Sequence, residues 1–100
     1  MKERGTKTMN KERRKRLEKI IVELENIQTT LDAEIREALE EIKSEEDEAL
    51  ENLPENLRYS ERAESMENAI NQLEDSDYTL SNIVDDIQSL IDSINEIVEG

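Results

Sequence analysis

A single proline at position 54 divides the 100 residues into two tracts of almost equal length. In both tracts, apolar residues recur at alternating spacings of three and four, which is the heptad rhythm of helices that pack side by side. Proline lacks an amide hydrogen and disfavours helical geometry in the residue before it, so a helix should end close to this point. The pattern therefore predicts an all-α fold, an antiparallel two-helix coiled-coil hairpin.

The hairpin is expected to form one domain over residues 9–100. Its first helix should span about residues 10–52 and its second about 60–99, with Ser60 as the N-cap of the second helix. The turn, residues 53–59, should place four residues at the hairpin tip: Leu53, Pro54, Leu57 and Tyr59. The apolar side chains of Leu53, Leu57 and Tyr59 are expected to fold over the tip. Residues 1–8 show no periodicity and are expected to form a flexible basic arm.

Counting in steps of four and three identifies the seam, the side of each helix that should face the other. In the first helix the seam positions are Leu17, Ile21, Leu24, Gln28, Leu31, Ile35, Ala38, Ile42, Glu45 and Ala49. In the second helix they are Met66, Ile70, Leu73, Asp77, Leu80, Val84, Ile87, Ile91, Ile94 and Val98. Because short connections join antiparallel neighbours, residues whose numbers sum to about 112 should lie opposite each other. The polar interruptions Gln28 and Asp77 are interpreted as selecting register or oligomeric state rather than as a ligand site.

Far from the turn, the apolar stripes are three columns wide, which is more than a pair of helices can cover. We therefore expect a homodimer that forms a four-helix bundle with isologous contacts at the end away from Pro54. The expected oligomer interface consists of Ile20, Ile27, Ile83, Ile87, Leu90, Ile94 and Ile97.

The formal net charge of -14 is unevenly distributed. Residues 1–19 contain nine Lys or Arg against three Glu, whereas residues 20–100 contain four against 24 Asp or Glu. Five carboxylates with spacings of three and four should line one helix face: Glu34, Glu37, Glu41, Glu45 and Glu48. This row has two interpretations, a solvated face that keeps a small oligomer soluble and a surface that binds a basic partner.

The basic segment at residues 11–16 has the sequence KERRKR. A cluster of this size can bind phosphate, RNA or an anionic membrane surface. We favour neutralisation by carboxylates that the hairpin should bring beside it, namely Asp85, Asp86, Asp92, Glu96 and Glu99.

The composition argues against an enzyme. With no His and no Cys, the chain lacks the commonest metal ligand, the usual general base near neutral pH and thiolate chemistry. No residue is singled out as catalytic, cofactor-binding or metal-ligating, and no cofactor or small-molecule substrate is expected. No apolar run approaches the ~20 residues of a membrane span, and the N-terminus lacks the apolar run of a signal peptide, so we expect a cytoplasmic protein without a membrane partner.

The turn and the start of the second helix contain NLPENL at 52–57, SE at 60–61, ME at 66–67, AI at 69–70 and LE at 73–74. Over residues 45–75 this pattern resembles short acidic helical-hairpin proteins encoded by phages and mobile elements of Gram-positive bacteria. The resemblance implies a hairpin tip and a mobile-element origin, and hence the cytoplasm of a bacterial host. It assigns no activity to particular residues.

Two hypotheses of function follow. In the first, the chain is a phage or mobile-element accessory protein that inhibits a host nucleic-acid-handling protein through a DNA-mimicking surface, as some anti-CRISPR proteins do. A net charge near -20 along a hairpin of about 50–60 Å gives about one charge per 2.5–3 Å, against about 1.7 Å in duplex DNA. In the second, the chain is a structural or adaptor coiled coil whose charges only solubilise it. Direct nucleic-acid binding is not expected, because the bulk charge repels phosphate.

Overall fold

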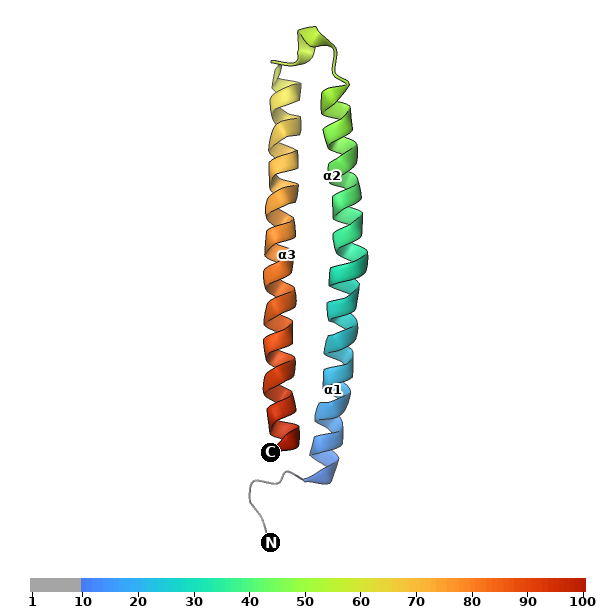
Figure 1. Cartoon of the computed structure of the whole chain (residues 1–100), viewed down its shortest axis with the longest axis vertical. Coiled ribbons are helices and arrows are strands. Elements are labelled where there is room, and N and C mark those ends of the chain that lie inside the picture. Colours follow the sequence, from blue (N-terminus) through green and yellow to red (C-terminus); the bar gives the residue numbers. More distant parts are fainter. Residues whose placement is uncertain (1–9) are drawn as a thin grey trace.

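The chain folds into two long antiparallel rods joined by a short turn (Figure 1), and the computed structural model describes residues 10–100. The first rod contains α1 (Lys11–Thr29), a π-helical turn η1 (Thr30–Ile35) and α2 (Arg36–Glu51). The second rod is α3 (Glu61–Glu99), and a short 3₁₀ helix η2 (Glu55–Leu57) lies between the rods. The predicted all-α hairpin is confirmed, and the arm expected over residues 1–8 lies outside the described residues.

Side-chain caps begin both rods. The Asn10 side chain accepts hydrogen bonds from the backbone amides of Glu12 at 2.8 Å and Arg13 at 3.3 Å. The Ser60 hydroxyl accepts one from the amide of Ala63 at 3.3 Å and donates one to the carbonyl of Leu57 at 2.6 Å. Ser60 is therefore the predicted N-cap, and it also ties α3 to the turn.

The hairpin tip is more open than the sequence predicts. Hydrogen bonds from Leu57 N to Pro54 O and from Ser60 N to Leu57 O close two consecutive turns that carry the chain from one rod to the other. Leu53 is half-buried, but Pro54 and Leu57 are exposed and Tyr59 is 99% exposed. The expectation that Leu57 and Tyr59 cover the tip is wrong, because the tight turns direct Tyr59 into solvent.

The core lies in the seam between the two rods, and its main cluster of buried residues lies between α1 and α3. Ile21, Ile91 and Ile94 are buried together, and four partly buried side chains pack against them: Leu17, Leu24, Ile87 and Val98. All ten predicted seam positions of α3 are buried or half-buried. The hydrogen bonds and ion pairs between the rods join residues whose numbers sum to between 112, for Gln28 and Val84, and 117, for Lys43 and Glu74. The rods are antiparallel as predicted, but the sum exceeds the predicted value of about 112 at most of these contacts.

In the first rod, the seam changes phase at η1. A π-helical turn holds one residue more than an α-helical turn, so the seam advances five positions, from Leu31 to Arg36, instead of four. Beyond this point the half-buried positions include Arg36, Leu39, Lys43, Glu46 and Leu50. The prediction is therefore wrong for the second half of this rod, where the expected seam residues are exposed: Ile35, Ala38, Ile42, Glu45 and Ala49.

Ion pairing gives a physical reason for the change of phase. Asp77 occupies a half-buried seam position of α3, where a carboxylate that is partly withdrawn from water is stabilised by a cation. Arg36 supplies it, with Nη1 2.8 Å from Asp77 Oδ1 and Nη2 3.0 Å from Ser81 Oγ. One turn further on, Lys43 Nζ lies 3.4 Å from Glu74 Oε1. The new phase also places Leu39 in the seam instead of the smaller Ala38.

Candidate functional site

Seven large apolar side chains are exposed along one flank of the hairpin. They lie immediately beside the seam, are each 41–51% exposed, and form what we call the apolar face: Ile20, Ile27, Ile35, Ile42, Ile83, Leu90 and Ile97. In both rods these residues occupy the same heptad position, and in an antiparallel pair like flanks of the two helices meet. A groove of about 250 Å³ that contains both Leu39 of α2 and Ile83 of α3 marks this shared flank.

The π-helical turn is what makes the row in the first rod continuous. Ile20 and Ile27 are seven residues apart, as are Ile35 and Ile42, but Ile27 and Ile35 are eight apart. The extra residue of η1 absorbs this difference, so the four isoleucines stay on one side. In an uninterrupted α-helix, Ile35 would be rotated by about 100° relative to this row and would enter the seam.

Five of the seven predicted interface residues lie on the apolar face, and two do not. Ile94 is buried in the core and Ile87 packs against it, so both stabilise the hairpin itself. Sequence reasoning also missed Ile35 and Ile42, which extend the face toward the turn. The signal that could have identified them is the eight-residue spacing between Ile27 and Ile35 in a row that otherwise repeats every seven.

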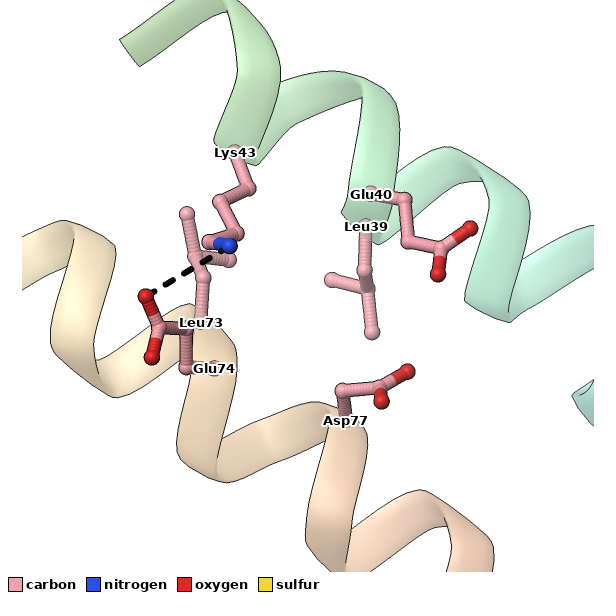
Figure 2. Close-up of a pocket in the computed structure, with 6 residues that line it drawn as sticks. All are labelled: Leu39, Glu40, Lys43, Leu73, Glu74 and Asp77. Carbon is pink, nitrogen blue, oxygen red and sulfur yellow. Dashed lines mark ion pairs between the residues drawn. The ribbon is translucent and has the colours of Figure 1, made fainter. Parts of the chain in front are cut away.

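The opposite flank is polar. A groove of about 370 Å³ there is lined by Leu39, Glu40, Lys43, Leu73, Glu74 and Asp77, and Figure 2 shows the Lys43–Glu74 ion pair at one side of it. Further along the same flank, the Gln28 amide donates to Gln88 Oε1 at 3.0 Å. Within residues 10–100 no three His, Cys, Asp or Glu side chains are grouped in a way that could hold a metal ion. The contacts on this flank fix the register of the rods.

The predicted acidic row is exposed on η1 and α2. Glu34, Glu37, Glu41, Glu45 and Glu48 all face solvent, with steps of three and four that keep them on one side of the rod. They belong to a wider anionic exterior. Of the 24 Asp and Glu residues in positions 20–100, all are exposed except three that are half-buried, Glu46, Asp47 and Asp77.

The basic segment at residues 11–16 forms the first turns of α1. Its charged side chains are exposed except that of Arg14, which is half-buried at the seam position seven residues before Ile21. Among residues 10–100, no ion pair of 4 Å or less joins this segment to the carboxylates of α3. The expected neutralisation by Asp85, Asp86, Asp92, Glu96 and Glu99 is therefore not observed in the described part of the chain.

No family model, curated protein or solved structure matches the chain. The resemblance to phage and mobile-element hairpins at the turn therefore stays a prediction. In the part of the chain that the structure describes, no helix is both long enough and apolar enough to cross a membrane.

Proposed function

We propose that this chain is a non-enzymatic protein-binding module whose anionic exterior binds a basic surface of another protein. The observation that carries this proposal is the near-complete exposure of the carboxylates between positions 20 and 100. A long surface of one sign of charge steers basic partners toward it and favours them over acidic ones.

The charge is concentrated next to the turn. Residues 34–78, which form this half of the hairpin, contain 16 Asp or Glu against four Lys or Arg. Residues 10–33 and 79–100, which form the open end of the hairpin, contain ten Asp or Glu against six Lys or Arg. In the half next to the turn, a net charge of -12 spread over roughly 35 Å gives about one charge per 3 Å, more than half the axial density of duplex DNA.

The whole hairpin is less dense in charge than the sequence suggested. Its long axis measures 79 Å, so the net charge of residues 20–100 gives about one charge per 4 Å over the full length. We therefore propose the half next to the turn, which carries the acidic row, as the partner-binding region. Tyr59 adds an exposed aromatic side chain of the kind that is enriched at protein interfaces.

The partner class that fits this surface is a protein with a basic nucleic-acid-binding groove, in which the hairpin would stand in for the phosphate backbone. With the resemblance at the turn, this supports an anti-CRISPR-like or other anti-defence inhibitor that a phage or mobile element produces in the host cytoplasm. Binding of this kind weakens steeply as salt increases.

Charge reversal at matched positions tests the proposal. The triple variant Glu37→Lys, Glu41→Lys and Glu45→Lys should no longer capture a basic host protein from lysate, and should no longer displace DNA from that protein. The control variant Asp85→Lys, Asp92→Lys and Glu96→Lys changes the net charge equally in exposed residues of the open end and should retain both activities. Equal loss in the two variants, or full retention in both, would contradict a binding surface next to the turn.

The second candidate function, a structural or adaptor coiled coil, is favoured by the apolar face. In that case the exposed carboxylates keep the assembly soluble, and neither triple variant changes partner capture. The apolar face then carries the biological contacts, and substitutions there abolish the function.

A further inference from the structure

We propose that a second copy of this chain covers the apolar face, and that the two hairpins form an antiparallel four-helix bundle with their turns at opposite ends. This inference goes beyond the anionic exterior and does not depend on it. Its starting point is the composition of the seam beyond η1, where Arg36 and Lys43 face α3 while Ile35 and Ile42 remain outside.

A seam that contains charged residues, with an apolar column exposed beside it, suits a helix that packs against two other helices. Helices in four-helix bundles bury three columns of their heptads, two in one seam and a third beside it. Each rod here has its third apolar column, and both columns lie on the same flank. An isologous pair of hairpins would bury all four columns at once.

The dimensions of the face match those of a stable interface. The hairpin measures 79 × 16 × 13 Å. If half of its 79 by 16 Å face is covered on each copy, about 1,200 Å² of surface is buried in total, which reaches the range of specific protein–protein interfaces. The area is therefore sufficient without any contribution from residues 1–9.

The sizes of the side chains along the face favour the antiparallel orientation. By the register of the contacts between the rods, Ile20 lies across from Ile97 at the open end, whereas Ile42 lies across from the small Ser76 nearer the turn. Turning one copy end for end places the bulky half of one face on the thinner half of the other, which fills the core evenly. The groove lined by Leu39, Asp75, Ser76, Thr79, Leu80 and Ile83 is then positioned to receive Leu90 from the second copy.

Charge favours the same orientation. In a parallel dimer, the two halves next to the turns would lie together, each with 16 acidic against four basic residues. In the antiparallel dimer, each of these halves lies beside the open end of the other copy, where residues 11–19 contain six Lys or Arg against two Glu. Like-charge repulsion is therefore lower in the antiparallel arrangement.

The orientation can be measured directly because the chain contains no Cys. Tyr59→Cys places one spin label at the exposed tip, and a mass of twice 11.6 kDa in sedimentation equilibrium would establish the dimer. The antiparallel bundle predicts a label-to-label distance of about 75 Å by pulsed electron paramagnetic resonance, since each tip lies about 25 residues from the dyad. A distance near 20 Å, or the mass of a single chain at high micromolar concentration, would overturn the proposal.

A matched pair of substitutions identifies the face. Ile27→Glu introduces a charge into the apolar face and should reduce the dimer affinity at least 100-fold. Val22→Glu alters a side chain that is 54% exposed but lies outside the face, and it should leave the dimer intact. If the two variants have the same dimer affinity, the face is not the interface. If Ile27→Glu lowers helicity, the label-to-label distance measured on the chain that carries only Tyr59→Cys decides whether the antiparallel dimer forms.

Discussion

Arg36 on α2 and Asp77 on α3 form an ion pair of 2.8 Å between two half-buried seam positions. The same guanidinium also contacts Asp32 at 3.1 Å and Ser81 at 3.0 Å, so one side chain links both rods. This contact holds α2 in the phase that η1 creates.

Arg36→Ala should reduce the free energy of unfolding by about 1–2 kcal/mol, because it leaves the Asp77 carboxylate in the seam without its cation. The double variant Arg36→Leu and Asp77→Leu should recover most of that loss, since two apolar side chains can replace a partly buried ion pair. Urea unfolding of Arg36→Leu alone, Asp77→Leu alone and the double variant, compared with the unaltered chain, completes a double-mutant cycle. Additive effects would contradict direct coupling between these two residues.

Deletion of Ala33 should be tolerated. It shortens the step from Leu31 to Arg36 to four residues and the step from Ile27 to Ile35 to seven, so a regular α-helix would retain the same seam and the same apolar face. The melting temperature should stay within a few degrees of the unaltered chain or rise.

Deletion of Asn82 is the matched control. It is also exposed and lies in the middle of a rod, but α3 has no extra residue to lose there. Every seam residue between this site and the end of α3 would be rotated by about 100°, and circular dichroism should show a cooperative loss of helix at much lower temperature. A similar melting temperature for both deletions would show that η1 does not set the phase.

The phase of α3 could be predicted from the sequence because only one set of positions with spacings of three and four is apolar there. In the first rod beyond Leu31, two sets that differ by one residue compete. Composition favours the set with Ile35 and Ile42, but the structure uses the set with Arg36 and Lys43. The phase of the first rod is decided by the positions of Asp77 and Glu74 on the other rod. The local periodicity of the first rod contains no information about them.

The acidic row and the apolar face also differ in how far the sequence predicts them. The acidic row was predictable because its members follow helix spacing, and all but Glu45 lie outside the seam in either phase; Glu45, a seam position in the predicted phase, is exposed in the phase that η1 creates. The apolar face was predictable only at the open end, where the phase is regular. Its extension through Ile35 and Ile42 depends on η1, for which the sequence offers one signal, the eight-residue step from Ile27 to Ile35.

Ile91→Ala should be the most damaging single truncation among the apolar residues of α3. Ile91 is 2% exposed at the centre of the core with Ile21 and Ile94, so the cavity cannot be filled without moving both rods. The expected loss is about 2–4 kcal/mol of unfolding free energy. Ile97→Ala removes the same atoms from a side chain that is 49% exposed and should cost less than half as much at concentrations where the chain is monomeric. Equal losses in chemical denaturation would place the core elsewhere.

Ser60→Ala should destabilise the hairpin by about 1 kcal/mol, because the amide of Ala63 loses its capping acceptor. Ser65 lies one turn further along α3 and is exposed, so Ser65→Ala should be neutral or slightly stabilising through the better helix propensity of alanine. Thermal unfolding of the two variants separates the cap from the general effect of removing a hydroxyl. A loss in Ser65→Ala as large as that in Ser60→Ala would argue against the cap.

Added salt should act in opposite directions on folding and on partner binding. The 16 acidic residues of the half next to the turn repel one another within and between rods, so screening from low to physiological ionic strength should raise the melting temperature. The same screening weakens attraction to a basic partner. The triple variant at Glu37, Glu41 and Glu45 relieves part of the repulsion and should show a smaller salt-dependent increase. A melting temperature that falls with salt would show that attractive ion pairs, such as Arg36–Asp77 and Lys43–Glu74, outweigh the repulsion in the folded hairpin.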